Sequence, residues 1–294
     1  RQRKLSRSKM PECSAYVMLQ KREPDMKEIT SKNANVQLNN GFETLSLHLQ
    51  ETMCLTLNAD KGTNTEMLIT YDGTQADLHI DVNAADDCEV RLLFWSEMNE
   101  TTRFELTINA QNNSKVHIGI ADLQSSEADY RIKAMLCHEG AEVNVTSACL
   151  ACHKHWLMHM EHQKAHTNSL MKNFAVTLEN GDYRMEACGA IQKGANECSS
   201  HQASRVLTMS ENHQCEVIPL LLIDENEVKA SHATTVGQPD EGQLYYLKSR
   251  GLSTKHALGL LKLGYLLPIT EIISDAQIQK QLRMQIEEKV MKHD

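Results

Sequence analysis

Cysteine and histidine are concentrated in one short stretch, from Cys149 to His166, which holds two cysteines and five histidines. Its first five residues, CLACH, have the C-x-x-C-H spacing of covalent haem attachment. The two cysteines with His162 and His166 also give C-x2-C-x9-H-x3-H, close to the spacing of a zinc finger. The residue types therefore raise two chemical interpretations, a haem site and a zinc site.

The same stretch alternates like a β-strand, and this alternation argues against both sites. In a strand, Cys149 and Cys152 would point to opposite faces and would not chelate one metal ion. The nine residues between cysteine and histidine are also fewer than the usual gap of about twelve. One side carries Trp156, Met158 and Met160, and the other carries His153, His155, His159 and Glu161. We predict a structural strand whose histidine-rich surface binds metal only adventitiously.

Short alternating segments recur from about residue 30 to 237 at a regular spacing. Val90, Val116 and Val143 follow one another at intervals of about 26–27 residues. Val217 lies close to three such steps beyond Val143, and a second segment often lies about 10–12 residues away within a step. This period predicts a parallel β-helix with two or three strands per coil. An antiparallel sandwich with strands about 8–12 residues apart is the alternative.

Helical periodicity replaces the alternation after residue 237. Asp240, with Gln243 three residues later, is a capping pair for a first helix, and Gly251 suits its end. Ser253 is the expected cap of a second helix that runs through about Leu263. We expect a final helix over residues 269–292, with an apolar stripe of Ile278, Leu282, Ile286 and Val290.

These patterns divide the chain into three parts. We predict an irregular or partly helical N-terminal segment over residues 1–29, the β-helix over 30–237, and a small helical domain over 238–294. Because the last part follows a sharp change of pattern, we expect the β-helix to fold without it.

The composition limits the possible partners and compartments. The chain has 294 residues and a formal net charge of −9, which favours neither nucleic acid nor an anionic membrane surface. The basic start, RQRKLSRSKM, leads into no apolar segment of a signal peptide, and the apolar run over 260–269 is too short to cross a bilayer. Nine cysteines without framework spacing indicate reduced thiols. We therefore expect a cytoplasmic protein that binds neither nucleic acid nor membrane.

Common catalytic motifs are absent from the sequence. It contains no phosphate-binding G-x-x-x-x-G-K-[ST] loop, no G-x-S-x-G elbow and no H-E-x-x-H zinc motif. We expect a protein that is not an enzyme and does not hydrolyse ATP itself. The alternative is a secreted-type β-helix carbohydrate-active enzyme, which would need clustered acidic or basic groups along one groove.

The segment over residues 221–265 resembles the C-terminal signature of the SufB/SufD family, the scaffold subunits of the SUF iron–sulfur cluster assembly machinery. The matching residues are Val228, Lys229, His232, Thr235, Val236, Gly237, Leu244, Tyr246, Leu247, Ser249, Arg250, Gly251 and Leu252. The resemblance implies a right-handed parallel β-helix with helical appendages. It extends less specifically over residues 179–219.

Within that family the sequence looks like the SufD type. Ala233 follows His232 where SufB-type chains have an acidic residue, and the segment over 199–205 lacks their upstream cysteine. Ala230 also replaces a cysteine that SufD-type chains carry two residues before the histidine.

The resemblance also implies a site and partners. His232 is the expected ligand of a transient iron–sulfur cluster at a subunit interface, with a structural buried histidine as the alternative. Cys198 and Cys215 are further candidate ligands, since thiolates normally hold such clusters, but both also suit a core position.

The implied partners are a SufC-type ATPase and a SufB-type subunit, or a second copy of this chain as a homo-oligomer. SufC would dock on the helical part through Tyr246, Arg250, Gly251 and Leu252. The resemblance leaves open whether a flavin binds.

Overall fold

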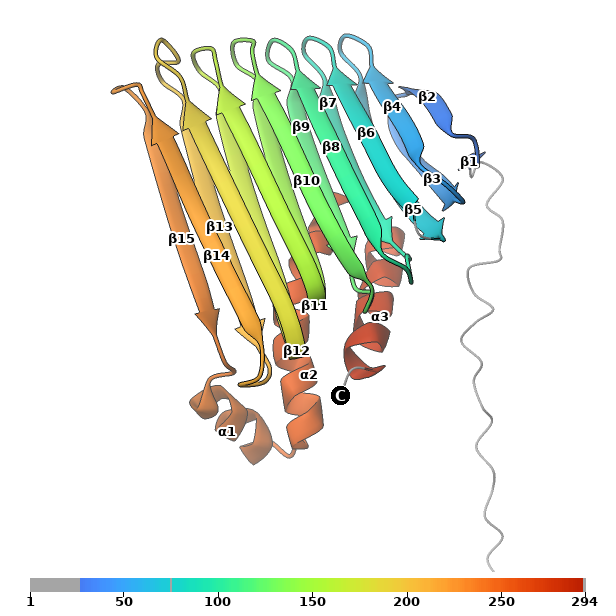
Figure 1. Ribbon diagram of the computed structural model, residues 1–294, viewed down its shortest axis with the longest axis vertical. Helices are drawn as coiled ribbons and strands as arrows, with labels where there is room; N and C mark the ends of the chain where they lie inside the picture. The colour runs from blue at the N-terminus through green and yellow to red at the C-terminus, as the bar shows by residue number, and fades with distance from the viewer. Residues whose placement is uncertain (1–26, 75, 293–294) are drawn as a thin grey trace, which may run out of the picture.

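The chain folds as a parallel β-solenoid with helices packed against one side (Figure 1). The computed structural model describes residues 27–74 and 76–292, so the expected N-terminal segment lies outside it except for its last three residues, which form β1. The predicted solenoid is confirmed, and each coil has two strands. All strand pairs that join successive coils are parallel.

The strands form two ladders, one on each face of the solenoid. The first ladder comprises β1 (Lys27–Ile29), β3 (Gly41–Leu49), β5 (Asn64–Gly73), β7 (Glu89–Ser96), β9 (Lys115–Asp122), the first halves of β11 (Glu142–His162) and β12 (Asn168–Ile191), β13 (Ser199–Thr208) and β15 (Lys229–Gly237). The second comprises β2 (Asn33–Leu38), β4 (Met53–Ala59), β6 (Ala76–Ala84), β8 (Thr102–Ala110), β10 (Glu127–Leu136), the second halves of β11 and β12, and β14 (Gln214–Ile223).

The register explains the period in the sequence. Val90 pairs with Val116, and Val116 pairs with Val143, so the steps between these valines are confirmed as single coils. The comparison of Val143 with Val217 was wrong, because Val217 pairs with Met185 in the second ladder. The coils are also longer in this part of the chain, because residues paired between β12 and β13 are 31 positions apart in the sequence.

In-register stacking places side chains of one kind above one another inside the solenoid. Phe104, Tyr130 and Trp156 occupy the same position in three successive coils. The Tyr130 and Trp156 rings are stacked with centroids 3.8 Å apart, and those of Phe104 and Tyr130 are 5.4 Å apart. Aromatic residues make up only 4 % of the chain, and this column concentrates several of them where they bury the most area.

Of the four helical segments in the described part of the chain, three cover the first ladder. The helical segments are α1 (Glu241–Ser249), α2 (Thr254–Leu266), the 3₁₀ helix η2 (Leu267–Ile272) and α3 (Ala276–Lys292). One buried cluster joins Leu263, Leu266, Ile269, Ile273, Leu282, Ile286 and Val290 to Leu93, Trp95, Ala121, Leu123, Ala148, Leu150, Val176 and Leu207 of the ladder and its turns. Removing the helices would expose this apolar face to water, which is a physical argument against the expectation that the β-helix folds without them.

The helix ends follow the capping residues, with two corrections. The Asp240 carboxylate accepts the Gln243 N–H at 2.7 Å, and Gly251 ends α1 with a φ of 93°, as predicted. However, α2 continues past Leu263 to Leu266 because its last turn packs on the solenoid. The final helix begins at Ala276 rather than residue 269, since η2 and a break precede it. Within the described residues no helix is long and apolar enough to cross a membrane.

Candidate functional site at the C-terminal end of the solenoid

The last coil of the described chain ends in two strands that lack an outer neighbour. β14 pairs only with β12, and β15 pairs only with β13, within the part that the structure describes. Three apolar side chains near these edges are exposed: Leu222 at 56 %, Ile223 at 40 % and Val236 at 45 %. An uncovered strand edge with exposed apolar residues can pair with a strand of another chain.

His232 lies in the middle of β15 and belongs to its inward-facing row. Its Cα partner in the coil below is Gln202, whose side chain is 4 % exposed inside the solenoid. Because side chains at paired positions of a parallel ladder point to the same face, the His232 ring also lies on the interior side. It is nevertheless exposed, since no further coil covers it. The imidazole is therefore accessible from the open end.

Cys198 is buried just before β13 and is tied into a polar network. It is 1 % exposed, and its Sγ lies 3.0 Å from Thr167 Oγ1 and 3.1 Å from the Lys164 carbonyl. Thr167 Oγ1 and Ser169 Oγ in turn contact the two ring nitrogens of His162, each at 2.8 Å. Burial lowers the pKa of His162 to about 4, so its ring is neutral at physiological pH.

Cys215 lies near the start of β14 and is half-buried against the main core. Burial, with a smaller contribution from Asp182, raises the pKa of its thiol to about 11. β13 and β14 run in opposite directions on the two faces, so Cys198 and Cys215 lie near opposite edges of the solenoid. The fold therefore does not bring the two cysteines and His232 together as one ligand set. Among the described residues, no group of three or more His, Cys, Asp or Glu side chains is placed to hold a metal ion.

The segment predicted to dock an ATPase is α1 and the turn after it. No residue of α1 is buried, and Tyr246 is 57 % exposed. The Arg250 guanidinium lies over the Tyr246 ring, 5.3 Å from its centroid, and Leu252 N–H bonds back to the Leu247 carbonyl at 3.4 Å. A hollow of about 530 Å³ lies between α1 and α2, lined by Asp240, Gly242, Gln243, Tyr246, Leu247 and Leu261. The exposed Tyr246 ring thus lies beside an open hollow.

The stretch from Cys149 to His162 is confirmed as strand, part of β11, with the predicted apolar side inward. Trp156, Met158 and Met160 are buried, while His153 and His155 are exposed. A bulge between Ala151 and His153 changes which parity faces inward. Cys149 is therefore also buried, and burial with the nearby Asp122 raises its pKa well above the usual range. His155 lies between two carboxylates, with its ring 3.5 Å from Asp129 and 3.2 Å from Asp182.

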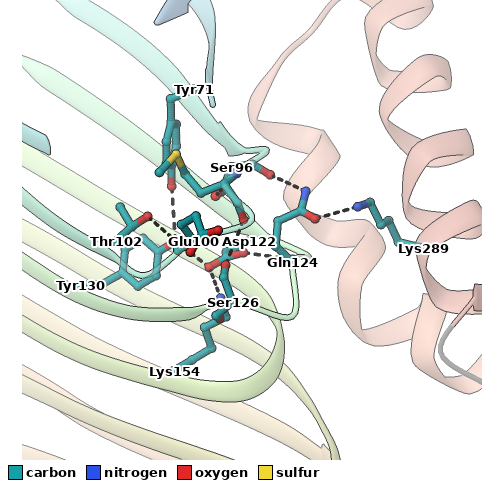
Figure 2. Close-up of polar contacts among 11 residues, drawn as sticks. Tyr71, Ser96, Glu100, Thr102, Asp122, Gln124, Ser126, Tyr130, Lys154 and Lys289 are labelled. Atoms are coloured by element: carbon teal, nitrogen blue, oxygen red, sulfur yellow. Dashed lines mark hydrogen bonds and ion pairs between the residues drawn. The ribbon is translucent and has the colours of Figure 1, made fainter. Parts of the chain in front are cut away.

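Sequence reasoning missed a buried ion pair at the centre of this region (Figure 2). Lys154 Nζ lies 2.5 Å from Asp122 Oδ2, and both side chains are at most 1 % exposed. Tyr130 donates to the same oxygen at 2.7 Å. The sequence could have predicted the burial of Lys154, because Lys154 and Trp156 both occupy even-numbered positions and therefore lie on the same, apolar side of the strand.

The ion pair is connected to the helices through Gln124, in the turn after β9. The Gln124 backbone N–H donates to Asp122 Oδ1 at 3.0 Å, and its side-chain oxygen accepts from Lys289 Nζ of α3 at 2.7 Å. Figure 2 shows this path from the solenoid interior to the helix. The interior and the helical layer are therefore joined by polar contacts as well as by apolar packing.

Comparison with known proteins gives a consistent result. Residues 48–265 match the family model described as SUF system FeS cluster assembly, SufBD core domain. The iron–sulfur cluster assembly protein SufD of Bacillus subtilis is 40 % identical over 123 residues, covering 42 % of this chain and 27 % of that protein. SufD of Escherichia coli is 25 % identical over 127 residues, covering 43 % of this chain and 30 % of that protein. The matched segment thus spans less than a third of either relative.

Proposed function

The chain belongs to the SufBD family as a SufD-like member, and we propose that it is a non-catalytic scaffold subunit of SUF iron–sulfur cluster assembly. The observation that carries the proposal is the family match, which runs from β3 through the last coil and into α2. The match also leaves no support for the alternative of a carbohydrate-active β-helix enzyme.

The partner that we propose for the open end is a SufB-type subunit. Its edge strands would pair with β14 and β15 and cover Leu222, Ile223 and Val236. Main-chain hydrogen bonds would supply affinity, and the apolar side chains would supply buried area. A second copy of this chain could pair in the same way, which is the homo-oligomeric alternative.

His232 is the residue that we propose for contact with the growing cluster. A neutral imidazole is a borderline ligand for iron, and His232 is an exposed, inward-facing donor at the open end. Cys198 and Cys215 lack this position, so thiolate and carboxylate ligands would come from the partner. The cluster is cargo here, assembled at the interface and passed on.

The ATPase partner, of the SufC type, would dock on α1. The support is the exposed Tyr246 ring and the open hollow beside it, since no residue of α1 is buried. Docking there would place the ATPase next to the end where the scaffold subunits meet, because α1 follows β15 directly.

Co-purification from native lysate tests the proposal as a whole. A tagged full-length chain should bring down a SufC-type ATPase together with a SufB-type subunit, and the complex should contain iron and acid-labile sulfide. Recovery of the chain with itself and SufC would support the homo-oligomer. Recovery of neither partner would refute the scaffold role.

A further inference from the structure

Gln202, below His232 in the last full coil, carries a buried oxygen atom without a hydrogen-bond partner. The side chain is 4 % exposed. Its Nε2 donates to the Leu220 carbonyl of β14 at 2.7 Å, whereas its Oε1 has no partner among the described residues. Buried polar groups in folded proteins almost always have a partner, so this oxygen points to an interaction that the chain is built to make.

The chemistry of the Leu220 carbonyl fixes which end of the amide is which. Nitrogen and oxygen of a glutamine side chain are interchangeable in shape, but a carbonyl can only accept a hydrogen bond. The NH₂ group must therefore face Leu220, and the oxygen must face away from it. The unpaired atom is an acceptor, and its partner must be a donor.

The register places a donor beside it. Gln202 and His232 are Cα partners on β13 and β15, which puts their backbones about 4.8 Å apart with both side chains on the interior side. Other pairs along these ladders hydrogen-bond from coil to coil. Ser169 and Ser200 hydroxyls are 3.0 Å apart, and His201 Nδ1 lies 2.8 Å from Ser231 Oγ between the same two strands.

We propose that Gln202 is a positioning residue for His232: a rotation of the exposed His232 side chain brings its ring N–H onto the unpaired Gln202 Oε1. A histidine that ligates a metal usually donates its other ring N–H to an oxygen acceptor, which fixes both the tautomer and the ring plane. The Gln202 hydrogen bond would leave the second ring nitrogen unprotonated and facing the open end, where iron would be bound. The inference rests on the role proposed for His232 and adds the group that orients it.

The test measures the tautomer of His232 directly. The full-length chain, with ¹⁵N-labelled histidine, is examined by NMR above pH 8, and the His232 signals are identified by their loss in His232→Gln. In the wild type, one tautomer should dominate by about five-fold beyond the ratio of free imidazole. In Gln202→Leu that excess should disappear. Gln285→Leu is the matched control, since Gln285 Oε1 on α3 is also buried and unpaired.

Two outcomes would overturn the inference. The tautomer ratio of His232 could be the same in the wild type and in Gln202→Leu, which would mean that the His232 ring does not donate to Gln202 Oε1. It could also change equally in Gln285→Leu, in which case the effect is not local. Gln202→Met, checked for folding by circular dichroism, replaces Gln202→Leu if the latter does not fold.

Iron and sulfide content of the co-purified complex separates this inference from the proposed function. Full content in His232→Gln would refute cluster ligation even if the tautomer still depends on Gln202. Conversely, loss of content in His232→Gln with a tautomer indifferent to Gln202 would refute only the positioning role.

Discussion

At the scale of single residues, substitutions of His232 can separate a role in binding iron from a role in packing. The side chain is exposed, so His232→Ala should change the free energy of unfolding by no more than about 1 kcal/mol, the typical net worth of the one hydrogen bond proposed with Gln202. Iron and sulfide in the complex should nevertheless fall, because the imidazole is gone. The conservative variant His232→Gln retains the size and polarity of the side chain but is a poor iron ligand. Full cluster content in His232→Gln would make His232 a structural residue.

His162 makes the stability of the chain depend on pH. Burial lowers its folded-state pKa to about 4, below the unfolded value of about 6.5. Between these values the unfolded chain binds more protons, so stability should rise with pH from about 4 to 6.5 and be fully present above that range. The contribution is at most roughly 3 kcal/mol. Urea unfolding at several pH values should show this slope, and His162→Gln should flatten it. An unchanged slope in the variant would assign the pH dependence to other groups.

At the scale of elements, the stretch from Cys149 to His166 should be structural, and its cysteines should be dispensable for cluster assembly. Cys149 is buried and its thiol pKa is raised, while Cys152 lies at the bulge. The double variant Cys149→Ala with Cys152→Ser should lose about 1–2 kcal/mol from the small cavity but keep its partners and its iron content. A stoichiometric zinc ion in the wild type that disappears in the variant would contradict this prediction.

Helix α1 offers a separate test of ATPase docking. Tyr246→Ala should weaken SufC binding measured by pull-down or calorimetry and leave the unfolding midpoint unchanged, since no residue of α1 is buried. Tyr245→Ala is the matched control, because Tyr245 is 77 % exposed on the same helix but does not line the hollow. Normal SufC affinity in Tyr246→Ala would place the docking surface elsewhere.

The sequence predicted those features of the fold and the site that depend on residue spacing within a single strand or helix. The coil period, the inward side of β11 and the Asp240 cap follow from local spacing, and all three are confirmed. The inward position of Lys154 could be read from its parity, but its partner could not, because Asp122 lies 32 residues away and meets Lys154 only when the coils stack. The position of Cys198 and Cys215 relative to His232 was equally unavailable, since it depends on which ladder each strand joins. The orphan oxygen of Gln202 needed side-chain geometry.

At the scale of the whole molecule, the helices and the solenoid should unfold together. The ladder residues under the helices come from five strands in successive coils, β7, β9, β11, β12 and β13, so the helices fasten those coils side by side. The contact between Lys289 and Gln124 adds a polar link to the interior. Solenoids can unfold coil by coil, but separating one coil here would also break its contacts with the helices.

The two tryptophans allow this cooperativity to be measured. Trp95 is buried between β7 and the helices, whereas Trp156 is buried in the aromatic column inside the solenoid. In Trp95→Phe the fluorescence comes only from Trp156 and reports the solenoid interior. In Trp156→Phe it comes only from Trp95 and reports the contact with the helices. Because coincident transitions are the mark of a single cooperative unit, each variant should give the same urea midpoint by fluorescence as by circular dichroism. If Trp95 fluorescence changed at lower urea, the helices would detach first, and the helical part would be a separate unit that a partner could displace from the solenoid.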